Sequence, residues 1–481
     1  MPTLLCVNKG LRLEDHPALN AAMSHNEPIL AVYCTDFSAP HLPQGASLWW
    51  LGESLKAFND SLAKFGGELL IHHGDAQSLV DIANQYHCTR LYFSCHHEPW
   101  LADTQKQLHD SCVKAGIECK RFGGQLLMAP DAILNQQGKP YQVFTPYYKA
   151  CKGQYAPGKI HNTRDQLKQV KWLTPKKAQT FSKTLKALNH QPSKPNWAKP
   201  IAECWQPGEA GAKAQLAHIN DIVSRYGQER DLPAIDATSK LSPHLHFGEL
   251  SPRAAWQTVS NAWPKGEAEP WLRQLVWREF SYYLLHHFPH ITASPFKENF
   301  KGFPWQSMKS SIVREQLSAW QKGQTGYPLV DAGMRQLWQT GWMHNRVRMV
   351  VASFLTKHLR IHWHEGADWF WDTLVDADMG NNIAGWQWVA GSGADAAPYF
   401  RIFNPITQSE KFDKEGHYIR EFVPELSKLE SKYIHAPWQA PKQALQKAGI
   451  ALGDNYPYPI VDHSEARQAA LDAYAELKNK T

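Results

Sequence analysis

The chain has 481 residues, with 51 Lys and Arg against 45 Asp and Glu, which gives a formal net charge of +6. This length exceeds what one ordinary core holds and predicts two or three domains, while a charged fraction of 20% argues against global disorder. No stretch of about 18 apolar residues and no signal-peptide pattern after Met1 occur, so we expect no membrane association. The mild positive charge permits nucleic-acid binding without requiring it.

Cysteine and histidine usage argues against a metal centre. All eight cysteines lie in the first 204 residues and none forms a C-x-x-C pair, so we expect free thiols in a reducing cytoplasm. The 24 histidines include neighbours such as His286 and His287 but no H-E-x-x-H motif. We interpret them as scattered surface and core residues and predict no metal site.

Short apolar runs alternate with amphipathic stretches over residues 1–130. This alternation predicts a Rossmann-like, doubly wound parallel sheet with helices on both faces. The expected strands are Leu4–Val7, Ile29–Tyr33, Glu68–His72, Arg90–Ser94 and Glu118–Arg121, and the clearest expected helices are Leu48–Phe65 and Gln77–Tyr86. The first strand runs into residues 8–12, Asn-Lys-Gly-Leu-Arg, rather than a glycine-rich loop, so a standard dinucleotide site is not expected there.

Regular patterning weakens from about Tyr148 to Gly211, where lysine and proline interrupt the chain, and we assign residues 131–211 to a connector. We predict a long connector that wraps the surface, anchored by Trp172, Trp197 and Trp205, although a disordered loop would show the same composition. Residues 212–481 are mostly helical in periodicity and predict a large all-α domain. The clearest helices there are Glu269–His286, Ser311–Trp320, Val330–Thr340 and Asn345–His358.

Two segments of this all-α region combine polar and aromatic side chains. Hydroxyls and a lysine crowd residues 238–242 and could hold a phosphate, although an ordinary helix cap would use the same residues. Helical spacing places Trp271, Gln274, Trp277 and Arg278 on neighbouring turns, where they could line a pocket for a flat heterocycle or simply form a packed stripe.

Two further segments are denser in polar groups. Residues 341–349 place Asn345 between an arginine and a thioether, a set that can contact a base edge, a phosphate and an aromatic face. Residues 376–388 hold two acids, two amides and two indoles. Residues 391–396 also match G-x-G-x-x-A, but no βαβ unit precedes them, so we reject that match.

Together these segments closely resemble the flavin core of the photolyase/cryptochrome family, and most of all bacterial cyclobutane pyrimidine dimer photolyases. The resemblance implies an antenna domain over residues 1–130, a connector over 131–211 and a helical FAD-binding domain over 212–481. It also implies the residues that bind FAD: Tyr226, Thr238, Ser239, Lys240, Leu241, Ser242, Trp271, Arg278, Asn345, Arg348, Asp376, Asp378 and Asn382. Arg348 and Asp376 would pair beside the flavin ring, and Asn382 would face its N5 atom.

The resemblance further implies an electron path, a lesion pocket and a DNA contact surface. Trp386, Trp363 and Trp305 would carry electrons from the surface to the flavin. The lesion pocket would contain Gln274, Trp277, Asn345, Arg346, Met349 and Trp388, and the DNA backbone would meet Arg230, Arg346 and Gln408. The implied reaction is light-driven repair of UV-damaged DNA, largely independent of sequence, by a cytoplasmic, nucleoid-associated monomer.

Some positions depart from the family pattern. Gln274 stands where dimer photolyases usually carry Glu, and glutamine there is more usual in (6-4) photolyases and animal-type cryptochromes. Met349 argues against (6-4) repair, because that reaction needs a histidine to transfer a proton. The segment 96–100 lacks the Asn-Glu pair of a folate binder, so an antenna of deazaflavin, of methenyltetrahydrofolate in altered geometry, or none stays open. A photoreceptor without repair and a light-independent nucleic-acid binder are the competing hypotheses.

Overall fold

The computed structural model describes residues 1–481 except 36–39, 156–157, 162, 193, 397–399 and 480–481. The described chain divides into two compact units. We call the first, Met1–Ser224 with Ser239–Pro289 and Val375–Gly380, the sheet unit. The second, Arg225–Thr238 with His290–Leu374 and Asn381–Thr481, is the helical unit. The domain limits expected from the sequence stay a prediction.

The described part of the sheet unit contains a five-stranded parallel sheet. Its strands are β1 (Thr3–Cys6), β2 (Ile29–Thr35), β3 (Leu70–His73), β4 (Arg90–Ser94) and β5 (Glu118–Phe122), in the order β3-β2-β1-β4-β5. In the register, Leu4 of β1 pairs with Leu30 of β2 and Leu91 of β4. The predicted parallel sheet is confirmed.

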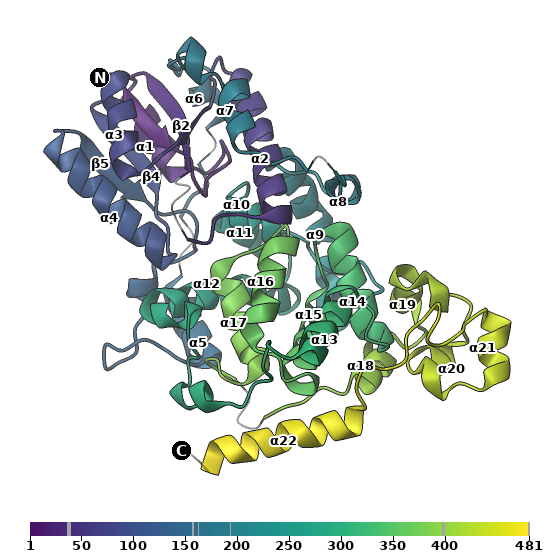
Figure 1. The fold of residues 1–481 in the computed structure, drawn as a ribbon. Helices are drawn as coiled ribbons and strands as arrows, with labels where there is room; N and C mark the ends of the chain where they lie inside the picture. The colour runs from purple at the N-terminus through teal and green to yellow at the C-terminus, as the bar shows by residue number, and fades with distance from the viewer. Residues whose placement is uncertain (36–39, 156–157, 162, 193, 397–399, 480–481) are drawn as a thin grey trace. The chain divides into compact units, whose positions relative to one another are not determined.

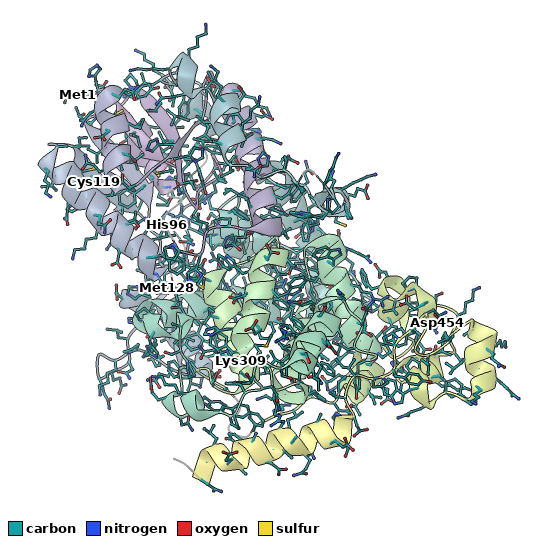
Figure 2. The ribbon with its side chains drawn as sticks, in the orientation of Figure 1. Met1, His96, Cys119, Met128, Lys309 and Asp454 are labelled. Atoms are coloured by element: carbon teal, nitrogen blue, oxygen red, sulfur yellow. The ribbon has the colours of Figure 1, made fainter. Side chains whose placement is uncertain are left out.

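Alternate residues of the strands face opposite sides of the sheet, and each side has its own core. On one side, Leu4, Leu30 and Leu91 pack against α3 (Ala76–Gln85) and α4 (Pro99–Lys114). On the other side, strand residues pack against α1 (Pro17–Met23) and α2 (Gly45–Ala63). Both layers are visible in Figure 1, and Figure 2 labels Cys119 of the edge strand β5.

The segment predicted as a connector folds onto the sheet unit. Its helices are α5 (Phe144–Gln154), α6 (Arg164–Leu167), α7 (Phe181–Ala187) and α8 (Ala198–Cys204). Leu185 and Ile201 enter the core beneath the sheet, and Trp172, Trp197 and Trp205 pack against it, as predicted. The unit continues with α9 (Glu209–Glu229), which extends into the helical unit, α10 (Ser242–Phe247), α11 (Pro252–Ala262) and α12 (Lys265–His287).

The helical unit is built from short and medium helices. They are α13 (Ser311–Gln321), α14 (Pro328–Thr340), α15 (Asn345–Ser353), α16 (Trp363–Thr373), α17 (Met379–Ala390, whose first two residues belong to the sheet unit), α18 (Pro405–Phe412), α19 (His417–Phe422), α20 (Ser431–Ile434), α21 (Lys442–Ala448) and α22 (His463–Asn479). None of the helices within the described ranges is both long and apolar enough to cross a bilayer.

The helix predicted over residues 345–358 changes type before its end. After α15, residues Phe354–His358 form a π-helical turn, in which Leu359 donates its N–H to the carbonyl of Phe354. Lys357 lies in this turn and is 1% exposed. Its Nζ donates to the carbonyl of Ala390 at 2.5 Å and lies 3.2 Å from the centre of the Phe400 ring. Burial lowers the pKa of Lys357 well below its usual value.

Candidate functional site

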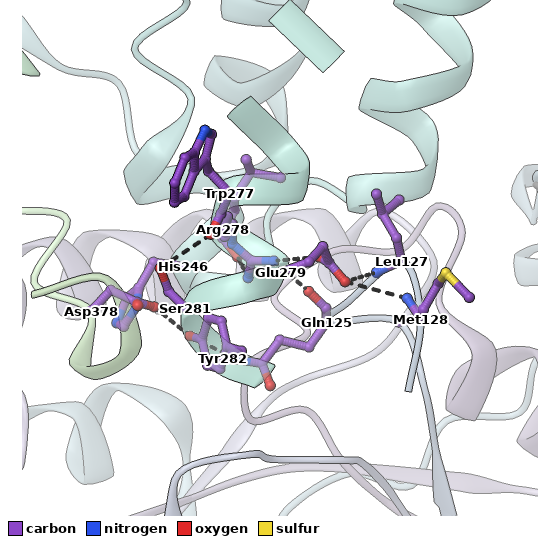
Figure 3. A network of polar contacts seen from close by, with 12 residues as sticks. Gln125, Leu127, Met128, His246, Trp277, Arg278, Glu279, Ser281, Tyr282 and Asp378 are labelled. Atoms are coloured by element: carbon purple, nitrogen blue, oxygen red, sulfur yellow. Dashed lines mark hydrogen bonds and ion pairs between the residues drawn. The ribbon is translucent and has the colours of Figure 1, made fainter. Parts of the chain in front are cut away.

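Asp378 is the centre of a buried polar network in the sheet unit (Figure 3). His246 Nδ1 lies 2.9 Å from Asp378 Oδ2, and the hydroxyl of Tyr282 donates to the same oxygen. On the far side of the imidazole, Lys9 Nζ lies 3.1 Å from His246 Nε2 and 3.4 Å from Glu98 Oε1. An ammonium can only donate, so Nε2 accepts from Lys9 and Nδ1–H donates to Asp378.

The network fixes the charge of two of its members. Burial acts to raise the pKa of Asp378, but the hydrogen bond from His246 and the cations Arg278 and Lys9 outweigh it, so the pKa falls well below its usual value. Burial, together with Lys9, lowers the pKa of His246. At neutral pH the pair is therefore a carboxylate beside a neutral imidazole.

Arg278 of α12 is held by two backbone carbonyls and by its neighbour Glu279, whose Oε1 lies 3.4 Å from Nη1. Its Nη1 donates to the carbonyl of Gln125 at 2.9 Å, and its Nη2 lies 3.4 Å from the carbonyl of Leu245. The neighbouring Glu279 accepts the N–H groups of Leu127 and Met128 at 2.8 and 3.3 Å, as Figure 3 shows. Burial raises the pKa of Glu279 to about 7, so this acid only partly balances the guanidinium at neutral pH.

The remaining candidate residues of α12 differ in exposure. Trp271 is buried, whereas Gln274 and Trp277 are half-buried. Gln274 Nε2 donates to the carbonyl of Pro270 at 3.1 Å, which uses one of its two N–H donors. Trp277 stacks on Phe144 with ring centres 3.5 Å apart and planes 6° apart. One face of the Trp277 indole is thereby covered and its orientation is fixed.

The predicted phosphate segment contains a backbone turn suited to an anion. Lys240 has a φ of +48°, and Leu241 follows with right-handed angles of −82° and −5°. A left-handed residue next to a right-handed one turns successive N–H groups toward one point, the arrangement known as an anion nest. Ser239 and the exposed Ser242 flank this turn in the sheet unit, whereas Thr238 belongs to the helical unit.

In the helical unit, α17 presents Asn382 in a defined orientation. Asn382 Nδ2 donates to the carbonyl of Ala367 at 2.9 Å, which leaves Oδ1 as an acceptor. Gln387, about one and a half turns later, fixes α17 to the backbone of residues 291–296. Its Oε1 accepts the N–H of Phe296 at 2.8 Å, and its Nε2 donates to the carbonyl of Ile291 at 2.8 Å.

The start of α15 gathers further candidate residues. His344 caps the helix through Nδ1, which accepts the N–H of Arg346 at 3.2 Å, and burial lowers the pKa of His344 to about 4. The guanidinium of Arg346 pairs with Asp231 at 2.9 Å and lies over a phenyl ring, and Arg348 Nε donates to a backbone carbonyl at 2.7 Å. Asn345 is exposed.

Other predicted contacts of the helical unit lie on several elements. Met349, Trp388 and Gln408 are half-buried on α15, α17 and α18. Tyr226 is buried on α9, and the guanidinium of Arg230 lies 5.8 Å from its ring centre. Arg230 therefore lies beside a predicted cofactor residue.

The three tryptophans predicted for electron transfer lie in the helical unit with graded exposure. Trp386 and Trp363 are 2% and 1% exposed, and Trp305 is half-buried. The rings of Trp305 and Trp363 lie 5.1 and 5.5 Å from the ring of His362, which stands next to both. The Trp386 indole lies directly against Gly366, one turn after Trp363 on α16.

Sequence reasoning missed five residues that fix Asp378 and Arg278: Lys9, Gln125, His246, Glu279 and Tyr282. A signal existed for one of them, because Lys9 follows the carboxyl end of β1, where parallel sheets place their functional groups. The structure brings Asp378 and Arg278 into one network, with Trp271 on the same helix. Predicted contacts between residues of different units, such as the pairing of Arg348 with Asp376, stay predictions.

Comparison with known proteins matches this organisation. Residues 3–190 match the family model described as DNA photolyase, and residues 271–476 match the model described as the FAD binding domain of DNA photolyase. A deoxyribodipyrimidine photo-lyase of Agrobacterium fabrum is 46% identical over 100% of this chain and 99% of its own length. Cryptochrome-1 of Arabidopsis thaliana is 34% identical over 99% of this chain and 70% of its own.

A solved structure shows the same sequence identity to this chain over nearly its full length. A bacterial class III photolyase from Agrobacterium tumefaciens superposes with a TM-score of 0.92 at 46% identity, covering 99% of this chain and 98% of that one. The sheet order, the helical C-terminal region and full-length similarity agree, so the predicted fold class is confirmed. This chain belongs to the photolyase/cryptochrome family.

Proposed function

We propose that this protein is a deoxyribodipyrimidine photo-lyase, which binds FAD and uses light to repair cyclobutane pyrimidine dimers in DNA. The observation that carries the proposal is the segment from Asp378 to Asn382, in which the charge of the first residue and the orientation of the last are fixed. One end is a buried carboxylate oriented by His246 and Tyr282, and the other is an amide whose acceptor oxygen is available. Such a segment suits a cofactor that gains and loses an electron.

The donor set of each unit fits part of FAD. In the sheet unit, the nest at Lys240 and Leu241 with the hydroxyls of Ser239 and Ser242 suits a pyrophosphate. Thr238 and Tyr226, in the helical unit, are the other residues that the family resemblance implies for this group. Flat or charged groups suited to the rest of the cofactor are supplied by Trp271, Arg278, Asn345, Arg348, Asp376, Asp378 and Asn382. When bound, FAD supplies light absorption and one electron for the lesion.

Asn382 would form a hydrogen bond with the N5 atom of the flavin ring. Its Nδ2 donates one N–H to Ala367, so Oδ1 could accept from the N5–H of a reduced flavin and the second N–H could donate to a bare N5. The same amide would therefore suit both states of this atom. Trp386, Trp363 and Trp305 would restore the reduced cofactor by passing electrons inward from the surface.

The lesion pocket would combine stacking with hydrogen bonding. Trp277, made rigid by Phe144, and Trp388 would hold the two fused pyrimidines by their faces, with Asn345, Arg346 and Met349 beside them. Photolyases are among the enzymes that flip their target out of the duplex, and a damaged, poorly stacked dinucleotide costs less to extrude than normal bases. Gln274 can offer its second N–H to a pyrimidine carbonyl.

DNA contacts would be made without reading sequence. Arg230, Arg346 and Gln408 can meet phosphates, which position a protein on DNA and carry no base information. Arg346 would exchange its partner Asp231 for a phosphate on binding. We further expect a monomer located in the cytoplasm and bound to the nucleoid through DNA.

A second chromophore is compatible with the chain, and its identity stays open between a deazaflavin and methenyltetrahydrofolate. In the segment where an antenna would bind, His96 and Glu98 are buried, and Glu98 already pairs with Lys9. These two side chains are therefore poor candidates for direct contact with an antenna.

The test is light-dependent repair of a defined lesion. The purified protein is reduced, mixed with an oligonucleotide that carries one cyclobutane thymine dimer, and illuminated with near-UV or blue light. We expect dimers to disappear in the light and to persist in the dark. Persistence in both would refute the repair assignment and favour a cryptochrome-type photoreceptor.

A second substrate and one variant refine this test. An oligonucleotide with a (6-4) lesion should remain unrepaired, because Met349 cannot supply a proton. The variant Gln274→Glu should repair dimers at least as fast as the wild type, because a carboxylic acid can donate to the same carbonyl. Slower repair by this variant would show that the amide at position 274 is itself required.

A further inference from the structure

Two histidines and an aspartate meet on the surface of the sheet unit. His286 and His287 are the last residues of α12, and Asp131 lies in the turn Pro130–Ala132. One ligand atom from each lies within 4.8 Å of the others, and within the described part of the chain this is the one such group of three. His286 Nε2 already lies 2.9 Å from Asp131 Oδ1.

The loop that carries Asp131 is held against α12 on both sides of this residue. Before it, Met128 donates its N–H to Glu279 at 3.3 Å, and after it, Ile133 accepts the hydroxyl of Tyr283 at 2.8 Å. The ring of Tyr283 also meets the ring of His287 at 4.5 Å, which orients that imidazole. The fold therefore positions the backbone of this loop and the imidazole of His287, and Asp131 reaches His286 from the loop.

Charge and geometry favour a cation at this position. The carboxyl end of a helix carries partial negative charge, and α12 is 23 residues long. The three ligand atoms already lie within 4.8 Å of one another, so a cation there would meet two imidazoles and one carboxylate at once. Asp131 adds a carboxylate whose side chain is 76% exposed, which leaves it room to rotate.

We propose that Asp131, His286 and His287 form a binding site for a divalent transition metal ion of the zinc class, with water as the fourth ligand. Two imidazoles and one carboxylate are the donor set of open tetrahedral zinc sites, whereas Mg²⁺ and Ca²⁺ prefer oxygen donors alone. Zinc bonds of about 2.0–2.2 Å place ligand atoms roughly 3.3 Å apart, so the cluster needs only small side-chain rotations to close.

The site is independent of the flavin reaction, and its sequence signal is weak. The aspartate lies 155 residues before His286, so no contiguous motif marks it. Zinc binding at this site would contradict the prediction from the sequence that the histidines are scattered and form no metal site.

Zinc binding can be measured directly on the flavin-containing protein. The protein is freed of metal with a chelator, dialysed, and titrated with ZnCl₂ at pH 7.5 by isothermal titration calorimetry. The variants are His286→Ala, His287→Ala and Asp131→Asn. His218→Ala is the matched control, because His218 also contacts a carboxylate, Asp221, and belongs to no group of three within the described residues.

We expect one site per chain in the wild type and in the control. Each of the three variants should weaken binding by at least about tenfold, since even indirect ligand supports are worth that much. Binding should also weaken when the pH falls to 5.5, because protons compete for the imidazoles. Flavin content and circular dichroism check that each variant is folded.

Two results would overturn the proposal. One is the absence of saturable zinc binding to the wild type. The other is a wild-type isotherm that His286→Ala and His287→Ala leave unchanged, which would assign the zinc to other surface histidines.

Discussion

The variant Gly366→Ala tests the contact between α16 and the innermost tryptophan. A Cβ atom at Gly366 would lie 2.1 Å from Cη2, 2.5 Å from Cζ3 and 2.6 Å from Cζ2 of Trp386. Non-bonded carbon atoms need about 3.5–4.0 Å, so the indole or the helix must move by more than about 1 Å. The indole has no free direction, because Trp320 and Phe370 pack on it with ring centres 6.2 and 5.0 Å away.

The magnitude follows from two opposing terms. Overpacking of a rigid core costs about 1–3 kcal/mol, and the overlap with three ring atoms places this case near the upper value. Alanine gains about 1 kcal/mol over glycine in a helix. The net loss of stability for Gly366→Ala is therefore about 2 kcal/mol.

Gly385→Ala is the matched control on α17. A Cβ at Gly385 meets nothing within 4 Å, and the position is exposed, so only the gain of about 1 kcal/mol applies. Urea unfolding followed by circular dichroism should separate the two variants by about 3 kcal/mol on opposite sides of the wild type. Gly366→Ala should also slow photoreduction of the flavin. Equal unfolding midpoints for the two variants would refute the packing of Trp386 against Gly366.

Three other outcomes follow. Trp386→Phe should lose most photoreduction of oxidised flavin yet keep repair by pre-reduced protein, and unchanged photoreduction would exclude Trp386 from the electron path. His246→Ala should lower the free energy of unfolding by about 2–3 kcal/mol and release flavin, because Asp378 loses a charge-assisted hydrogen bond. His246→Asn can still donate a hydrogen bond and should lose less stability. Equal losses of stability in the two variants would contradict this role of His246. Stability should fall as the pH drops from 6.5 toward 4, by up to about 1.4 kcal/mol per pH unit for each histidine that only the unfolded chain protonates. Burial lowers the pKa to about 3 or 4 in six histidines: His16, His96, His97, His344, His358 and His362. A free energy of unfolding that does not change over this pH range would contradict these low pKa values.

Most of the sheet could be predicted because β1, β2 and β4 are short, nearly fully buried runs between recognisable helices. The edge strand β5 carries three charged residues and is only partly buried, which is why its sequence signal is weaker. Every strand end lies within two residues of the expected position. The change to a π-helical turn after α15 could not be foreseen, because helical periodicity alone does not distinguish a wider turn.

The candidate site was predictable only where its residues stand close together in the chain. The segments around Arg278 and Asp378 were found because polar and aromatic groups cluster there. The partners that set their charge come from distant segments: Lys9 lies 237 residues before His246, and Gln125 lies 153 residues before Arg278. Such contacts depend on tertiary packing, and a single sequence carries no direct signal for them.

The buried Lys357 can serve as a chemical probe of opening in the helical unit. The residue is 1% exposed, so an acylating reagent that labels surface lysines should leave it unmodified in the folded state. The amine can react only when its contacts with Ala390 and Phe400 open. The labelling rate of this one residue, read by mass spectrometry, would then measure how often the region around the π-helical turn exposes its interior to solvent.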